Sequence, residues 1–100
     1  SGNIEKMGLR VHAITPGLMQ RLELDSPNGV LITDVVPNSP VGAAGIVRGD
    51  VIAEIDRKKI NNLNDFQEIM NKTNNKDTVL FLIKRSGSTL FIAVKKEIKK

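Results

Sequence analysis

The side chains that could carry catalysis are few in this chain of 100 residues, which has one histidine, His12, and no cysteine. A histidine-dependent triad, a thiolate nucleophile or a His/Cys metal site would therefore lack its partners. No G-x-S-x-G elbow frames a serine, and no phosphate-binding glycine loop is present. The aspartates are scattered, and Asp50, directly after Gly49, fits turn chemistry at the start of a strand. We expect no catalytic residue, no metal and no cofactor, and an exposed or half-buried strand position for His12.

Binding chemistry is more promising in the stretch EKMGLRVHAI (Glu5 to Ile14). Gly8 stands at the head of an apolar strand, where backbone N–H groups without a side chain beside them can approach a ligand closely. Successive N–H groups in such a turn form a nest for an anion, for example a terminal carboxylate. The strand that follows could accept an added peptide strand. From this stretch alone, a glycine that only eases a tight turn is the more economical explanation.

Period-2 patterns and turn residues predict the strands that would hold this loop. The expected strands are Met7–Ile14, Gly29–Val36, Asp50–Asp56, Thr78–Arg85 and Thr89–Lys96, with a hairpin turn at Ser86–Ser88. The strand Thr78–Arg85 is almost continuously apolar, which is typical of a strand that is buried on both faces.

Helices are predicted from capping residues. Ser39, Pro40 and Gly45 suit the cap, first position and end of a short helix. A longer helix is expected with Asn64 as N-cap and Gln67 completing a capping box. Thr15 and Pro16 could begin a third helix, which Gly17 disfavours. The sum is about five main strands with one short and one longer helix. We therefore predict a mainly β fold with two helices (α+β), a small, partly open five- to six-stranded barrel capped by helices.

Composition limits the remaining classes of protein, namely globular, membrane-spanning and nucleic-acid-binding. Hydrophobic residues make up 40% and charged residues 26% of the chain, which suits one small globular domain. Three Phe and no Tyr or Trp require an aliphatic core. No run reaches the roughly 18 apolar residues of a membrane span. The formal charge of +4 is better explained by solvated lysines than by a nucleic-acid or membrane patch.

Several stretches together resemble a PDZ domain. KMGLRV is similar to the x-Φ-G-Φ carboxylate-binding loop (Φ, apolar) of that family, and NLNDFQEIM is similar to its groove helix. The long stretch GVLITDVVPNSPVGAAGIVRGDVIAEIDRKKI resembles the family's most specific signature. The ending IKRSGSTLFIAV, and the opening MGLRVHAITPGLMQRLEL, resemble the second, C-terminal PDZ domain of HtrA/Do (DegP/DegQ-like) serine proteases. The order of these stretches matches the circularly permuted, bacterial form of the fold.

This resemblance implies a set of site residues. The backbone N–H groups of Met7, Gly8 and Leu9 would bind a peptide carboxylate, and Leu9 and Val11 would line the groove floor. The helix wall would carry Leu63, Gln67 and Met70, with Phe66 facing the core. In a helix rotated by one residue, Phe66 would join Met70 in the wall instead. No histidine begins this helix, so apolar C-terminal residues with little polar selectivity upstream are expected. Gly8→Val should then abolish binding and leave the fold largely intact.

The resemblance also implies a parent protein and its setting. Residues 1–5 would be a cloning remnant or linker, residues 6–96 the PDZ domain, and residues 97–100 a basic tail. The parent would be a periplasmic quality-control endoprotease whose catalytic domain lies upstream, and this fragment would not be an enzyme. Its partners would be C-termini or extended segments of unfolded proteins, with no nucleic acid and no membrane insertion. The alternatives are an assembly contact with other domains or subunits, or a PDZ domain of a site-2 protease, a tail-specific protease or a secretion component.

Overall fold

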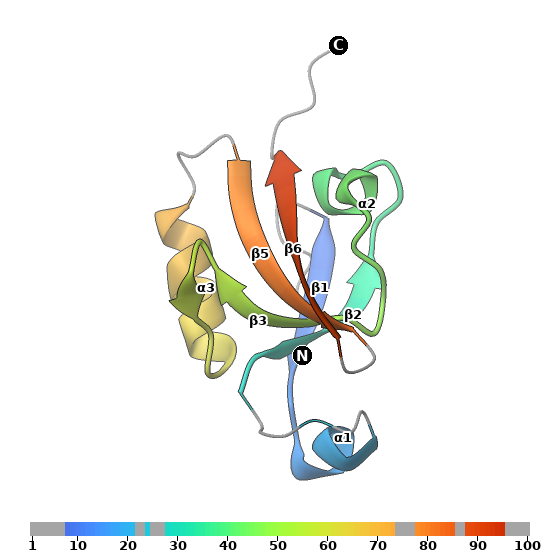
Figure 1. Ribbon diagram of the computed structural model, residues 1–100, viewed down its shortest axis with the longest axis vertical. Coiled ribbons are helices and arrows are strands. Elements are labelled where there is room, and N and C mark those ends of the chain that lie inside the picture. Colours follow the sequence, from blue (N-terminus) through green and yellow to red (C-terminus); the bar gives the residue numbers. More distant parts are fainter. Residues whose placement is uncertain (1–7, 22–23, 25–27, 74–77, 86–87, 96–100) are drawn as a thin grey trace.

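The computed structural model describes residues 8–21, 24, 28–73, 78–85 and 88–95, and Figure 1 shows their arrangement. Met7, the 86–87 part of the expected hairpin turn, and the terminal segments 1–5 and 97–100 lie outside the described residues. The elements, in chain order, are β1 (Leu9–Ala13), α1 (Pro16–Arg21), β2 (Val30–Val35), α2 (Pro40–Ala44), β3 (Val51–Ile55), β4 (Lys58–Lys59), α3 (Leu63–Lys72), β5 (Thr78–Arg85) and β6 (Ser88–Lys95).

The strands form one antiparallel sheet in the order β1-β2-β3-β5-β6, with β4 paired to β3. The sheet is open, so β1 and β6 are its two edge strands. The mainly β prediction and the order of its elements, with the Gly8 loop first and β6 last, are confirmed. α3 and β1 are in contact, and α2 packs against β6.

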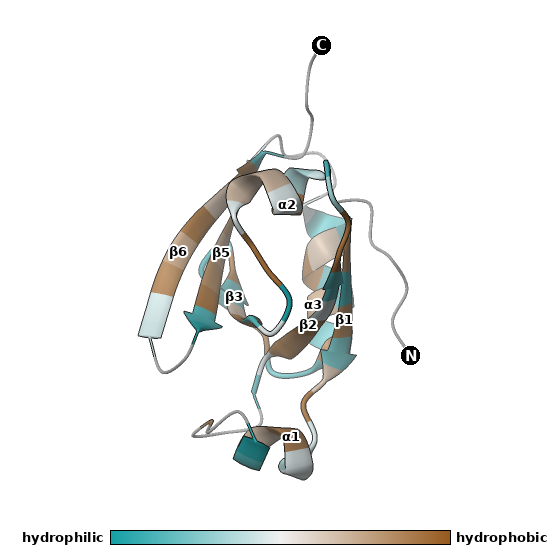
Figure 2. Cartoon of the chain, turned by 90° about the vertical axis from the view of Figure 1, so that its right-hand side faces the viewer, coloured by the Kyte–Doolittle hydropathy of each residue, from teal (hydrophilic) through white to brown (hydrophobic). Residues whose placement is uncertain are grey.

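The described chain has three helices where two were expected. α1 forms despite Gly17, because Thr15 caps it: the Thr15 hydroxyl accepts from the Leu18 N–H at 3.2 Å, and the Thr15 carbonyl accepts from the Met19 N–H at 2.8 Å. No residue of α1 is buried. Figures 1 and 2 both show α1 at one end of the molecule, beyond the end of β1 and apart from the sheet.

The N-cap predicted for α3 is wrong by two residues. The helix begins at Leu63 with Asn62 as its cap, and Asn62 Oδ1 accepts from the Asp65 N–H at 2.8 Å. The Asp65 carboxylate in turn accepts from the Asn61 N–H at 3.1 Å. Asn64 is an exposed residue inside the helix, so it is not the N-cap that the expected capping box with Gln67 requires. The pair formed by Asn62 and Asp65 satisfies two amide donors at the helix start, which is why it determines the boundary.

The core is aliphatic, as predicted, and two of the three phenylalanines, Phe66 and Phe81, are its largest side chains. The expectation that β5 is buried on both faces is wrong. Val79, Phe81 and Ile83 are buried, whereas the alternate residues Leu80, Leu82 and Lys84 are half-buried. The face that carries these alternate residues is therefore only partly covered in the described part of the chain. On that face Phe91 of β6 is 61% exposed and lies opposite Leu82.

One ion pair joins β3, β5 and the end of α2. Asp50 is 1% exposed, and its carboxylate accepts from Arg85 Nε at 2.8 Å and from Nη2 at 2.7 Å. It also accepts from the Val47 N–H at 3.2 Å, which confirms the turn role expected of Asp50. Arg85 Nη2 additionally donates to the Gly45 carbonyl at 3.2 Å. Hydrogen bonding to Asp50, and then its negative charge, raise the pKa of Arg85 above its ordinary value.

Replacing this buried carboxylate tests its structural role. We expect Asp50→Asn to lower the free energy of unfolding by about 1–3 kcal/mol, since an amide can accept at only one of its two terminal atoms and leaves buried donors unpaired. Urea denaturation measures the change. Asp34→Asn is the matched control, because Asp34 is exposed and exposed substitutions change stability by about 0.5 kcal/mol or less. Equal effects of the two substitutions would contradict a structural role for the pair.

Candidate functional site: the free edge of β1 beside α3

Gly8 is fixed by its backbone conformation and by a close neighbour. Its φ is +91°, a left-handed value that favours glycine, and its carbonyl accepts from the Val36 N–H at 2.7 Å. A Cβ built on Gly8 would overlap the Ser39 Cβ and would lie 2.6 Å from the Ser39 Oγ. The expectation that Gly8→Val would leave the fold largely intact is therefore wrong, because a larger side chain must displace Ser39.

Ser39 is held in place by its own hydrogen bonds. It is the N-cap of α2, where its hydroxyl accepts from the Gly42 N–H at 3.2 Å and donates to the Val36 carbonyl at 2.6 Å. Ser39 is 7% exposed. The contact between Gly8 and Ser39 thus fastens the start of β1 to the start of α2. The sequence indicates Gly8 as a loop glycine and Ser39 as a helix cap, but no local pattern predicts that the two residues are in contact.

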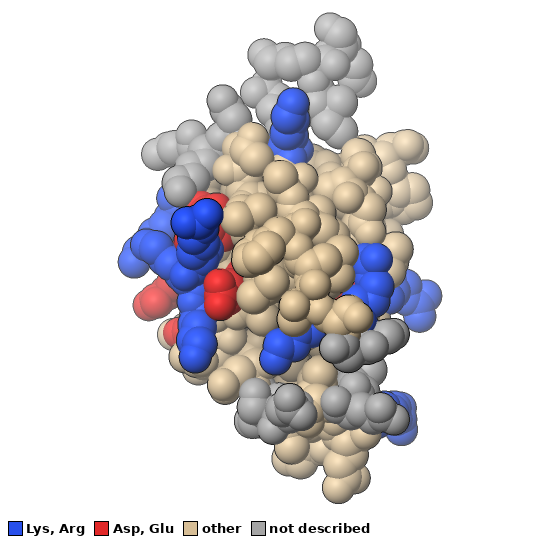
Figure 3. All heavy atoms as spheres, viewed as in Figure 1, with Lys and Arg blue, Asp and Glu red and all other residues tan. Residues whose placement is uncertain are grey.

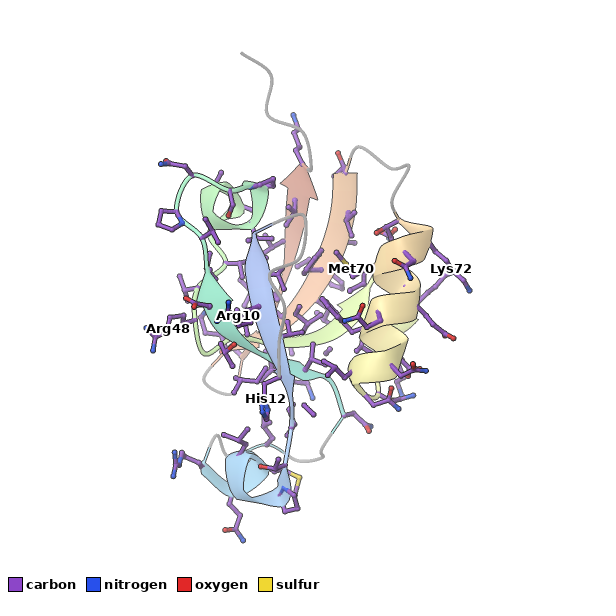
Figure 4. All side chains as sticks on the ribbon, turned by 180° about the vertical axis from the view of Figure 1, so that it is seen from behind. Arg10, His12, Arg48, Met70 and Lys72 are labelled. Carbon is purple, nitrogen blue, oxygen red and sulfur yellow. The ribbon has the colours of Figure 1, made fainter. Side chains whose placement is uncertain are left out.

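β1 presents one backbone edge that no described strand occupies. Its only partner in the described sheet is β2. The Gly8 carbonyl points to β2, since it accepts from Val36. N–H and C=O groups alternate in direction along a strand, so those of Leu9 and Val11 point to the opposite edge. This edge is the one on the α3 side in Figure 4.

The register of the β1–β2 pair keeps β1 regular. Arg10 lies opposite Asp34 but Val11 lies opposite Ile32, so the extra residue, Thr33, belongs to β2. The Thr33 hydroxyl donates to the Arg10 carbonyl at 3.2 Å, which satisfies that group at the irregularity. The bulge therefore disturbs the inner strand and leaves the hydrogen-bonding pattern of the edge strand undisturbed.

The predicted floor residues contribute backbone to this edge. Leu9 is 0% and Val11 is 2% exposed, and both side chains belong to the core. These side chains anchor β1 in the core, so only the backbone of Leu9 and Val11 is directed to the free edge. Met7, the first residue of the predicted carboxylate loop, lies outside the described residues.

α3 places three of the predicted wall residues along one stripe. Leu63 and Met70 are half-buried and pack against the core, and Gln67 between them is exposed. In Figure 4 Met70 extends from α3 toward the sheet. Phe66, which the alternative helix rotation would place in the wall, is 0% exposed and lies in the core with Ile69. The structure therefore gathers the Gly8 loop, the free edge of β1 and a largely apolar helix stripe in one region.

Polar side chains line the outer side of β1. Arg10 and His12 are both exposed and lie along β1 in Figure 4. The Arg10 guanidinium is 3.9 Å from the Asp34 carboxylate. His12 Nδ1 lies 2.8 Å from the Ala13 carbonyl. His12 is thus the exposed strand residue that the sequence predicted.

Other site chemistries find little support in the described residues. No cluster of three or more His, Cys, Asp or Glu side chains that could hold a metal ion occurs among them. No described helix is long and apolar enough to cross a membrane. On the face shown in Figure 3, Lys and Arg side chains stand in separate groups around an uncharged centre, and Asp and Glu lie among one group. This described face is not a continuous basic surface of the kind that follows a nucleic-acid backbone.

An open antiparallel sheet with a glycine loop at the head of a free edge strand, and a helix beside that edge, is the architecture of a PDZ domain. Residues 6–95 match the family model of the PDZ domain, and the chain belongs to this family. PDZ domains are not catalytic, and the chain consists of such a domain. The resemblance to the PDZ family, identified from the sequence, is thus confirmed.

The relatives are HtrA-type serine proteases. A probable periplasmic serine endoprotease DegP-like of Chlamydia pneumoniae is 28% identical over 95 residues, covering 94% of this chain and 19% of the relative. Serine protease HTRA3 of Rattus norvegicus is 29% identical over 98 residues, 92% of this chain and 21% of the relative. Serine endoprotease DegS of Haemophilus influenzae is 35% identical over 78 residues, covering 78% of this chain and 23% of the relative. The chain spans about a fifth of the length of these curated relatives.

Solved structures agree with this assignment. The HtrA3 PDZ domain bound to a phage-derived ligand, FGRWV, has a TM-score of 0.76 at 25% identity, covering 91% of this chain and 83% of that one. The HtrA-type protease AlgW with a tripeptide has a TM-score of 0.70 at 25% identity, covering 88% of this chain and 29% of that one. Both of these neighbours were solved with peptides.

Substituting two glycines that have nearly the same backbone angle distinguishes the cost of backbone strain from the cost of the overlap with Ser39. Gly49 has a φ of +92°, close to the +91° of Gly8, but a Cβ on Gly49 would meet nothing within 4 Å. We expect Gly49→Ala to cost about 1–2 kcal/mol of stability through backbone strain alone. Gly8→Ala should cost about 1–3 kcal/mol more, because the new methyl overlaps Ser39. Denaturant titration measures both.

A Ser39→Gly substitution in the Gly8→Ala background removes the overlap and should restore part of that extra loss, relative to Ser39→Gly alone. If Gly8→Ala and Gly49→Ala prove equally destabilising, the approach to Ser39 is not what requires glycine at residue 8.

Proposed function

We propose that this domain binds the C-termini or extended segments of unfolded proteins by adding them as a strand to the free edge of β1. The observation that carries the proposal is that edge: Leu9 and Val11 direct backbone N–H and C=O groups away from β2, and no described strand pairs with them. A peptide would supply the missing hydrogen bonds, and pockets for alternate side chains would add selectivity.

The carboxylate end of such a peptide would lie at the Gly8 loop. The N–H groups of Met7, Gly8 and Leu9 would donate to it, and the left-handed Gly8 helps to turn successive amides toward one point. The apolar last side chain would then contact Leu63 and Met70 of α3, with Gln67 at the rim. Methionine suits such a contact because its flexible thioether chain adapts to different side chains.

The parent of this domain would be a periplasmic HtrA/Do-type serine endoprotease acting in protein quality control, with this domain as a regulatory, substrate-recruiting module in the C-terminal PDZ position. The support is the similarity to the DegP-like and DegS proteases over most of this chain. The periplasmic location rests on the names of those relatives. The catalytic domain would lie in a different part of the parent.

A peptide titration tests the strand-addition proposal. A peptide that ends in valine should bind with a dissociation constant of about 10–100 µM, since four or five added residues and one filled apolar contact give weak binding. Amide resonances of Gly8, Leu9, Val11 and Met70 should shift on titration. The same peptide with an amidated C-terminus should bind at least several-fold more weakly, because amidation removes the charge that the loop would hold.

Met70→Ala should weaken binding several-fold through lost apolar contact, and Glu68→Ala, an exposed substitution elsewhere on α3, is its control. Equal binding of the free and amidated peptides, or shifts confined to residues remote from β1, would contradict the proposal.

A second role, contact with another domain or subunit of the parent, is favoured by the outer face of the β5–β6 hairpin. Phe91 is 61% exposed there, beside the half-buried Leu80 and Leu82. In the full-length parent, Phe91→Ser should then shift the sedimentation coefficient toward smaller assemblies, and Thr89→Ser on the same strand should not. An unchanged assembly in the Phe91 variant would argue against this role.

A further inference from the structure

We propose that Arg10 selects chain ends that carry an acidic side chain at the next-to-last position. This inference rests on the strand-addition function proposed above and extends it to the charge of the ligand. It departs from the expectation of little polar selectivity, which rests on the absence of a histidine at the start of the groove helix, whereas Arg10 lies on the outer side of β1.

The direction of strand addition determines which ligand residue meets Arg10. A peptide whose terminal carboxylate lies at Gly8 runs antiparallel to β1, so its last residue lies opposite Leu9 and its next-to-last residue opposite Arg10. Residues directly opposite each other in an antiparallel pair project to the same face of the sheet. Leu9 and Val11 are buried on the inner face, and Arg10 is exposed on the outer face. The next-to-last side chain of the ligand therefore projects beside Arg10.

Arg10 is available for such a contact. Its ion-pair partner, Asp34, is 3.9 Å away, and the two side chains are 44% and 52% exposed. An exposed pair at this distance is weak and screened by solvent, so little holds the guanidinium over β2. The Arg10 backbone, in contrast, is fixed by the hydrogen bond from Thr33 to its carbonyl. The guanidinium has enough donors to contact Asp34 and a ligand carboxylate together.

The described residues of α3 beside β1 form an uncharged stripe. The α3 stripe that faces β1 carries Leu63, Gln67 and Met70, none of which is charged. An acidic residue third from the ligand's end would project inward toward this apolar stripe and would lose hydration there. The fourth residue from the end would lie opposite His12, whose Nδ1 already lies 2.8 Å from the Ala13 carbonyl. The charge effect should therefore be greatest at the next-to-last position.

Matched peptides test this positional selectivity in the domain as it stands. The reference peptide ends in valine and has alanine at the three preceding positions; variants carry aspartate or lysine at one of these positions each. By fluorescence anisotropy at low salt, we expect the aspartate peptide to bind about 3–10-fold more tightly than the lysine peptide at the next-to-last position. The ratio should shrink at high salt. At the third position from the end, aspartate should weaken binding relative to alanine.

Two protein variants separate Arg10 from the overall charge. Arg10→Gln should bring the aspartate-to-lysine ratio at the next-to-last position to about one. Lys58→Gln removes the same charge at an exposed site on β4, which pairs with β3 and not with β1, and should leave the ratio unchanged. This inference is overturned if the ratio persists in Arg10→Gln, or if the ratio is about one in the unmodified domain. In either case, carboxylate-dependent binding of the reference peptide would still uphold the proposed function. Failure of the reference peptide to bind overturns both.

Discussion

The contact between Gly8 and Ser39 is the constraint on which the candidate site depends. It joins the head of the edge strand to the cap of α2, so the backbone direction at the start of β1 is determined by a helix that lies far along the chain. Two small residues meet where a single added methyl has no room. The hydroxyl of Ser39 is already committed to Val36 and Gly42, which leaves it little freedom to retreat. A loop held this firmly can present its amides in one fixed arrangement, and preorganisation of that kind reduces the cost of binding.

The sequence was a good guide wherever a local pattern determined the outcome. Capping residues around Ser39 and Gly45 located α2, and alternation located the strands. It failed where the outcome depended on partners distant in the chain. Asn62, not Asn64, caps α3: its side chain accepts from the Asp65 N–H, and the Asp65 carboxylate accepts from the Asn61 N–H. The pairing of Asp50 with Arg85 joins residues that no local pattern connects. For the same reason the sequence indicates Gly8 as a loop glycine and Ser39 as a helix cap, but not that the two residues are in contact.

The two edges of the sheet have different characters. β1 carries buried apolar residues inside and polar ones outside, beside a helix stripe of Leu63, Gln67 and Met70. β6 has α2 packed against it and exposes Phe91 on its outer face. Only the first edge combines an unpaired backbone, in the described chain, with a loop whose glycine is conformationally required. This asymmetry is what distinguishes a site for an extended chain from a mere boundary of the sheet.

The basic side chain on the outer side of β1 also bears on the stability of the monomer in solution. An unpaired strand edge is a template on which a second copy of the same protein can assemble, and folded proteins commonly protect such edges with charge. If two copies of β1 met antiparallel about a two-fold axis, the Arg10 and His12 side chains of both copies would project from one narrow ribbon, with the guanidinium groups repelling each other. The edge would therefore disfavour its own dimer while it would accept the acidic strand proposed above. Protection from aggregation and choice of partner would here be two effects of one arginine.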